Sequence, residues 1–152
     1  MSDPQSPSFR RAVVALNGGS SDTRIVRLVV GQATKEMELI AVHVVEIDWT
    51  LPLDADIAGR SEEVQRVLDS AEAIAESRKL TMEPVLLQAR DVGAAIVDEA
   101  TERSADLLVV GLPYRKRFGG DFMIGRTVPY ILQNAPCAVW VVREPMGEEE
   151  AS

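Results

Sequence analysis

The chain has 152 residues, of which 26% are charged and 46% are apolar, and its formal net charge is −8. These values fit one globular domain with a single core, and the acidic balance excludes a general nucleic-acid binder, which needs a basic face. The single cysteine, Cys137, excludes an internal disulfide. No apolar run approaches the roughly 20 residues that cross a bilayer, and the N-terminus lacks a secretory pattern. We therefore expect a cytoplasmic protein without membrane insertion.

Strand-like and helix-like segments alternate along the chain. The apolar runs are mostly continuous, as in strands buried on both faces of a parallel sheet, and the segments between them have apolar residues at helical spacing. Alternation of this kind, with short connections, predicts an open α/β sheet with helices on both faces. In chain order we expect strand 12–16, a helix from 20–22 to 33, strand 39–45, helix 61–79, strand 84–89, a helix capped by Asp91 and ending near Arg103, strand 106–111, helix 128–135 and strand 138–142.

The two ends of the chain differ in composition from the middle. We expect residues 1–8 to form a flexible N-terminus and residues 9–143 to form the single domain. Residues 144–152, EPMGEEEAS, are acidic and lack a helical stripe. This composition is typical of a disordered tail.

The stretch 111–127, GLPYRKRFGGDFMIGRT, concentrates positive charge in an acidic chain. Its four cationic residues against Asp121 give +4 − 1 = +3, so the remaining residues carry −8 − 3 = −11. One interpretation is a solvated loop, and the other is a positive island that attracts anions. Both interpretations stay open at this stage.

The end of the same stretch precedes a predicted helix, whose free N–H groups suit a phosphate. Gly125 would let a phosphate approach the backbone, Arg126 could donate a charge-assisted hydrogen bond, and Thr127 could supply a hydroxyl. Alternatively, Thr127 is the N-cap of the helix, a role that needs no ligand. A glycine and a polar residue before a helix do not decide between these alternatives.

Several segments resemble the universal stress protein family. They are RRAVVALNGG, LIAVHVVE, SADLLVVG and, most specifically, LLVVGLPYR followed by GGDFMIGRTVPYILQNAPCAVWVV. The resemblance covers nearly the whole chain. It implies a five-stranded parallel sheet in the order 3-2-1-4-5 and a dimer, and it implies that ATP or a related adenine nucleotide is bound in some members and not in others.

The resemblance can be followed residue by residue in the glycine motif G-x2-G-x9-G-S/T. Gly111 and Gly125 match its first and last glycines, whereas Tyr114 stands in the place of the second glycine. Arg126 stands where the family has a phosphate-binding Ser or Thr, and Thr127 follows it. The resemblance therefore implies a phosphate site at this loop, altered at two of its four points.

Three further positions correspond to the nucleotide site of the family. Asn17 ends the first strand where nucleotide-binding members have aspartate, and Val44 and Val110 stand where such members line the adenine pocket. The complete candidate site that the resemblance implies is Asn17, Val44, Val110, Gly111, Gly125, Arg126 and Thr127.

Other residues suggest no turnover chemistry. His43 lies in an apolar strand and is interpreted as a core residue, and Cys137 as a buried small side chain. The segment 46–60 is either a plain surface loop or a flap beside the ligand crevice. No catalytic triad, paired carboxylates or metal-ligand spacing is evident, so we expect neither a catalytic residue nor a resident metal.

Three functions remain open. The first is a regulatory stress-response protein that binds ATP or AMP, with Mg²⁺ accompanying the nucleotide, without efficient turnover. The second is a nucleotide-independent dimeric interaction module with a regulatory protein partner, and slow ATP hydrolysis is a distant third. In all of them we expect a homodimer through the fifth strand, whose uncharged run offers Val139, Trp140 and Val141 to a partner.

Overall fold

The computed structural model describes residues 9–52, 61–114 and 124–146. Within these ranges strands and helices alternate as the sequence predicts, and each element lies within two residues of its predicted bounds. The elements are β1 Arg11–Leu16, α1 Ser21–Gln32, β2 Glu38–Glu46, α2 Ser61–Ser77, β3 Met82–Ala89, α3 Val92–Glu102, β4 Leu107–Leu112, α4 Thr127–Asn134 and β5 Ala138–Arg143.

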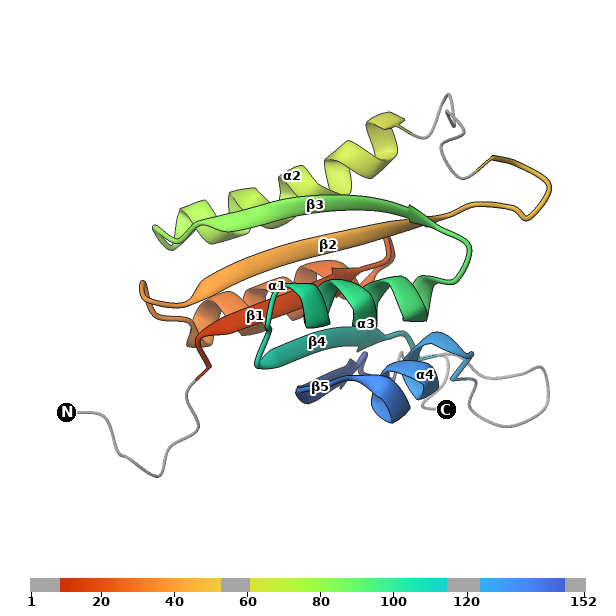
Figure 1. Ribbon diagram of the computed structural model, residues 1–152. Coiled ribbons are helices and arrows are strands. Elements are labelled where there is room, and N and C mark those ends of the chain that lie inside the picture. Colours follow the sequence, from red (N-terminus) through yellow and green to blue (C-terminus); the bar gives the residue numbers. More distant parts are fainter. Residues whose placement is uncertain (1–8, 53–60, 115–123, 147–152) are drawn as a thin grey trace.

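The five strands form one parallel sheet in the order β3-β2-β1-β4-β5 (Figure 1). β1 lies in the middle, where Val13 pairs with Ile40 of β2 on one side and with Leu108 of β4 on the other. The predicted fold class and strand order are therefore confirmed. Because the strands are parallel, all their carboxyl ends lie along the same edge of the sheet.

Helices cover both faces of the sheet, which explains why the strands read as continuous apolar runs (Figure 1). The face under α1 and α2 takes Ala12, Val14 and Leu16 from β1. The face under α3 and α4 takes Val13 and Ala15 from the same strand. None of the described helices is long and apolar enough to cross a membrane.

Two helix starts differ in how they are capped. The carboxylate of Asp91 accepts a hydrogen bond from the Ala94 N–H, so the predicted cap of α3 is confirmed. Of the two alternatives for Thr127, the role of N-cap is wrong, since Thr127 is already the first helical residue of α4 and Arg126 is the N-cap, without a side-chain cap bond. Gly125, with a φ of +75°, turns the chain into the helix one residue earlier than predicted.

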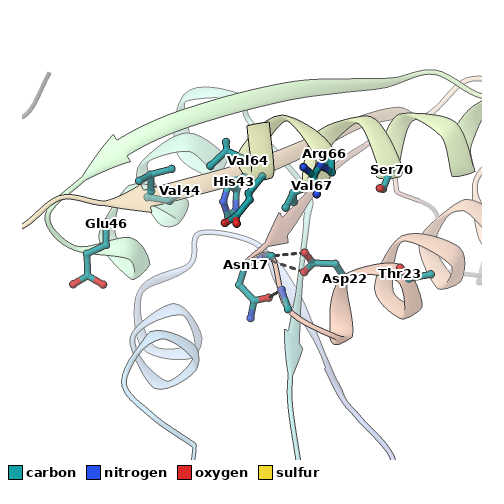
Figure 2. Close-up of a pocket in the computed structure, with 14 residues that line it drawn as sticks. Asn17, Asp22, Thr23, His43, Val44, Glu46, Val64, Arg66, Val67 and Ser70 are labelled. Carbon is teal, nitrogen blue, oxygen red and sulfur yellow. Dashed lines mark hydrogen bonds between the residues drawn. The ribbon is translucent and has the colours of Figure 1, made fainter. Parts of the chain in front are cut away.

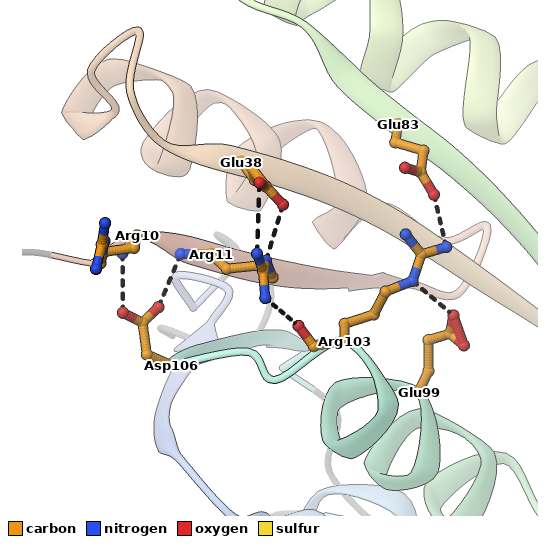
Figure 3. Close-up of polar contacts among 7 residues, drawn as sticks. All are labelled: Arg10, Arg11, Glu38, Glu83, Glu99, Arg103 and Asp106. Carbon is orange, nitrogen blue, oxygen red and sulfur yellow. Dashed lines mark hydrogen bonds and ion pairs between the residues drawn. The ribbon is translucent and has the colours of Figure 1, made fainter.

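The amino edge of the sheet is closed by charged side chains (Figure 3). The Asp106 carboxylate accepts the backbone N–H groups of Arg10 and Arg11, both at 2.9 Å. Burial alone would raise the pKa of Asp106, but these hydrogen bonds and the Arg10 charge lower that pKa below its ordinary value. This carboxylate therefore ties the start of β4 to the start of β1.

Two arginines extend these contacts across the edge (Figure 3). The Arg11 guanidinium pairs with Glu38 at 2.8 Å and donates to the Arg103 carbonyl at 2.7 Å. Arg103 in turn pairs with Glu83 of β3 at 2.6 Å and with the buried Glu99 of α3 at 3.1 Å. The amino ends of β1, β2 and β3 are thus linked to one another and to α3 by charged groups with fixed partners.

Candidate ligand-binding site

A pocket of about 770 Å³ opens where β1 and β2 end (Figure 2). Its volume lies within the range of about 300–1,000 Å³ that is typical of small-molecule sites. Its walls come from the loop after β1, the end of β2 and the first half of α2. The residues that line it are Asn17, Gly18, Gly19, Asp22, Thr23, His43, Val44, Val45, Glu46, Glu63, Val64, Arg66, Val67 and Ser70.

The loop after β1 binds its own carboxylate. Asp22, in the first turn of α1, accepts the backbone N–H of Asn17 at 3.0 Å and that of Gly18 at 2.8 Å (Figure 2). The Asn17 side chain accepts the N–H of Gly19 at 2.7 Å. A loop of this kind can use its N–H groups to hold an anion. Here those three donors are already occupied by side chains of the same loop and helix.

Asp22 is the most strongly buried carboxylate of this pocket wall. Burial raises the pKa of Asp22 above its ordinary value, and the hydrogen bonds from Asn17 and Gly18 and the nearby His43 oppose that rise only in part. The pocket therefore holds a carboxylate whose charge is only partly compensated. A cation or a hydroxyl donor would be favourable beside it, and a second anion would not.

His43 lies in the pocket wall as well as in the core. It is 8% exposed, and its Nδ1 lies 2.9 Å from the carbonyl oxygen of Leu16. A carbonyl oxygen only accepts, so Nδ1 carries the hydrogen, and Nε2 of the neutral ring is an acceptor. The interpretation as a core residue is confirmed, but no sequence pattern indicated that the ring also lines a pocket.

The pocket is acidic overall. Three carboxylates against one guanidinium leave two formal negative charges in excess when His43 is neutral. These charged residues are Asp22, Glu46, Glu63 and Arg66. Uncharged polar groups that accept or donate hydrogen bonds lie among these charged residues. The pocket therefore suits a polar ligand, or a polar part of a larger ligand, if that group carries little negative charge.

A smaller pocket of about 120 Å³ lies beside the start of α4. It is lined by Glu46, Asp91, Val92, Arg126, Thr127 and Tyr130, so Glu46 belongs to both pockets. Arg126 Nη2 lies 3.4 Å from Glu46 Oε1, and the two side chains are 89% and 54% exposed. An exposed ion pair of this length contributes little stability, so Arg126 can exchange Glu46 for another anion at low cost.

The structure places four of the seven candidate residues in the two pockets and three outside them. Asn17 and Val44 line the larger pocket. Arg126 and Thr127 line the smaller one. The remaining three residues line neither pocket, and each has a different environment.

Val110 and the two motif glycines have structural roles. Val110 is 3% exposed and packs in the core under α3 and α4. A Cβ on Gly111 would lie 2.7 Å from the Cβ of Ser21, so glycine is needed there for β4 to approach the start of α1. Among the described residues, nothing lies within 4 Å of a Cβ built on Gly125, and its φ of +75° favours glycine.

Tyr114, which replaces a motif glycine, lies toward the edge strand. The Arg143 guanidinium lies 4.8 Å from the centre of its ring, and Tyr114 lines neither of the two pockets. The three cations at 115–117 lie outside the described residues, so Arg126 is the one cation of the stretch 111–127 that the structure describes.

The loop after β2 is held by one arginine as far as residue 52. Arg90 donates to the carbonyls of Asp48 and Leu51, at 2.8 and 2.9 Å, and its guanidinium lies 5.0 Å from the centre of the Trp49 ring. The Trp49 side chain is 78% exposed. Residues 53–60 lie outside the described ranges, so the question of a flap over the pocket stays open.

An open parallel sheet with helices on both faces defines an α/β protein, and its larger pocket lies where β1 and β2 end, the edge at which such sheets commonly bind ligands. Across the described part of the chain, no three His, Cys, Asp or Glu residues gather closely enough to hold a metal ion. The model of the universal stress protein family matches residues 8–143, and the chain belongs to that family.

Several solved structures share the fold of this chain. A universal stress protein from Archaeoglobus fulgidus is similar with a TM-score of 0.72 at 20% identity, covering 89% of this chain and 99% of that one. The universal stress protein from Archaeoglobus fulgidus in complex with dAMP has a TM-score of 0.67 at 20% identity, covering 88% and 98%. A universal stress protein in complex with cAMP has a TM-score of 0.66 at 21% identity, covering 91% and 100%. By sequence, the chain matches none of the curated proteins with which it was compared.

Proposed function

We propose that this protein is a cytoplasmic stress-response regulator that binds an adenine nucleotide across the two pockets without efficient turnover. The observation that carries this proposal is the adjacency of the pockets, which share Glu46. The larger pocket has the volume of a small-molecule site, and its polar walls carry more carboxylates than guanidinium groups. The smaller pocket contains the exposed guanidinium of Arg126. A nucleotide has the same two-part chemistry, since a polar base and sugar are joined to an anionic phosphate.

The larger pocket suits the nucleoside. Val44 offers an apolar surface for a base, and Asn17 and His43 Nε2 offer hydrogen-bonding groups. The carboxylates of the pocket can accept hydrogen bonds from ribose hydroxyl groups, which carry no charge. The acidic walls of the larger pocket are therefore compatible with the nucleoside part of a nucleotide.

The smaller pocket suits the phosphate. Arg126 can donate charge-assisted hydrogen bonds, and the Thr127 hydroxyl and the first N–H groups of α4 lie at the same helix start. Mg²⁺ would accompany the nucleotide if ATP is bound. The relatives in complex with dAMP and cAMP support an adenine ligand for this family member as well.

Ligand-dependent stabilisation tests this proposal. AMP at 100 times its dissociation constant should raise the free energy of unfolding by about 2.7 kcal/mol, measured as an increase in melting temperature. Arg126→Ala should weaken AMP binding about tenfold or more, because a charged donor to phosphate is lost. Arg24→Ala is the matched control, since Arg24 is exposed on α1 and lines neither pocket.

Three outcomes separate the candidate functions. Equal AMP binding by wild type and Arg126→Ala would exclude Arg126 as the phosphate ligand. Absence of any response at millimolar AMP and ATP would favour the nucleotide-independent interaction module, which the occupation of the loop N–H groups by Asp22 supports. Steady release of phosphate from ATP would instead favour the slow hydrolase.

We further propose a homodimer through β5, which lies at an edge of the sheet. Val141 is 37% exposed, whereas Val139 and Trp140 are half-buried, and the Trp140 ring packs edge-on against Phe9 at 5.3 Å. Val141 is therefore the side chain best placed for a partner copy. Residues 138–142 of this edge strand carry no charge, and such an edge invites pairing with a second chain.

Sedimentation at micromolar concentration tests the dimer. Val141→Lys should convert it to a monomer, because pairing would bury an unpaired charge. Leu86→Lys places the same charge at an exposed position of β3, the opposite edge strand, and should leave the dimer intact. A wild-type protein that already sediments as a monomer would refute the dimer, and dissociation by Leu86→Lys alone would move the interface to β3.

A further inference from the structure

We propose that Glu46 selects the ligand by charge, so that the site binds an adenine nucleotide with one phosphate more tightly than a triphosphate. This inference rests on the proposed nucleotide function and specifies its ligand class. Three observations support it: the position of Glu46, the size of the pocket around Arg126, and the occupation of the other donors near the ligand.

Glu46 lies where the two halves of a nucleotide would meet. It ends β2, lines both pockets and pairs with Arg126 at 3.4 Å (Figure 2 shows its carboxylate at the end of the strand). A phosphate that binds Arg126 must replace or share this carboxylate. Every negative charge on the ligand near Arg126 is therefore also near Glu46, and the second and third phosphates of ATP add such charges.

The space around Arg126 is small. The pocket that Arg126 lines has a volume of about 120 Å³, against about 770 Å³ for the neighbouring pocket. A single phosphate has five heavy atoms, so this pocket suits one phosphate group better than three. Asp91 also lines this pocket, so further phosphates there would meet a second carboxylate.

Among the described residues, the backbone donors of the loop after β1 are not available to a longer phosphate chain. The N–H groups of Asn17 and Gly18, which could form an anion-binding loop, are held by the Asp22 carboxylate. Turning the phosphates toward the larger pocket would bring them against its excess of carboxylates. Among the described residues of the two pockets, Arg126 is the guanidinium on the α4 side and Arg66 the one on the α2 side.

The size of the effect follows from Coulomb's law. Two unit charges about 4 Å apart in water interact by about 1 kcal/mol, which corresponds to a factor of about 5 in affinity. Because Glu46 is half-exposed, the value for water is the appropriate one. A triphosphate carries about two more negative charges than a monophosphate, so ATP should bind at least about fivefold more weakly than AMP.

Calorimetric titration with AMP and with ATP tests this inference, in EDTA and at low salt so that Mg²⁺ and screening do not reduce the difference. Wild type should bind AMP about fivefold more tightly than ATP. Glu46→Gln keeps the hydrogen-bonding shape and removes the charge, so it should tighten ATP more than AMP and lower the ratio. Glu62→Gln is the control, because it changes net charge equally and Glu62 lies exposed in α2 outside both pockets.

The result distinguishes this inference from the proposed function. If wild type binds both nucleotides equally, or if Glu46→Gln leaves the ratio unchanged, nucleotide binding stands and the role of Glu46 is refuted. If Glu62→Gln changes the ratio as much as Glu46→Gln, net charge and not position explains the selectivity, and the role of Glu46 is again refuted. If neither nucleotide binds to wild type or to either variant at millimolar concentration, both proposals fall.

Discussion

Asp106 and Asp22 lie at opposite edges of the same sheet, and each carboxylate accepts two backbone N–H groups. The pKa of Asp106 is nevertheless lowered, because its hydrogen bonds and the Arg10 charge outweigh its burial. The pKa of Asp22 is raised, because its burial outweighs its hydrogen bonds. The same local pattern thus has opposite consequences in two electrostatic environments.

Other charged residues show the same difference between the amino edge and the carboxyl edge of the sheet. At the amino edge, Arg11 and Arg103 have carboxylate partners at 2.8 and 2.6 Å (Figure 3). At the carboxyl edge, the one ion pair near the pockets that the described residues form is the exposed contact of Arg126 with Glu46 at 3.4 Å. Charge stabilises the fold at the amino edge. At the carboxyl edge, the carboxylates of the larger pocket outnumber its one guanidinium.

Replacing the aspartate of the amino edge should have the larger effect on stability. Asp106→Ala should lower the free energy of unfolding at pH 7 by about 2 kcal/mol, since hydrogen bonds to a charged acceptor contribute about 1.5–3 kcal/mol each and water can replace the carboxylate at the exposed Arg10 N–H. Urea unfolding measures this difference. Asp98→Ala, on the exposed face of α3, is the control and should change stability by less than about 0.5 kcal/mol.

The pH dependence of Asp106→Ala has a defined sign. Because the folded pKa of Asp106 lies below its ordinary value of 3.8, its contribution is fully present above that value and is lost as pH falls through the folded pKa. Wild type and variant should therefore become equally stable on acidification. A difference that grows as pH falls would contradict the account of this edge.

Replacing the aspartate of the carboxyl edge should have a smaller effect. Asp22→Ala removes two hydrogen bonds to exposed N–H groups but also removes a buried charge, so stability at pH 7 should change by less than about 0.5 kcal/mol. Because the folded pKa of Asp22 is raised, its contribution is fully present below 3.8 and is lost as pH rises through the folded pKa. Wild type should thus gain stability over the variant between neutral pH and about pH 4.

The same urea measurements at pH 7 and pH 4 check Asp22→Ala. A loss of 2 kcal/mol or more at pH 7 would mean that Asp22 stabilises the loop in the same way as Asp106 stabilises the amino edge. The contrast between the two edges would then be wrong.

The fold could be predicted from the sequence because local patterns determine it. Continuous apolar runs such as 12–16 distinguish strands buried on both faces, and Asp91 marks a helix start by its own side chain. The start of α4 was misplaced by one residue because the positive φ of Gly125 is a backbone property that the sequence permits without specifying.

The site was harder to predict, because it depends on contacts between distant residues. Asn17 and Val44 were found through the family resemblance, but Glu46 gains its importance from Arg126, which lies 80 positions away. The role of Gly111 also depends on distance in space, since only packing shows that it meets the start of α1. Asp22 carried a usable signal, since an acidic residue in the first turn of a helix after a glycine pair is placed to accept loop N–H groups.

Mass spectrometry under native conditions tests most directly whether the carboxyl edge holds an adenine nucleotide. Protein purified gently, without added ligand, would be measured before and after incubation with AMP. The account predicts a species heavier than the chain by one AMP per subunit, which Arg126→Ala diminishes and Arg24→Ala retains. Only the unliganded mass, even after incubation with millimolar AMP, would contradict it.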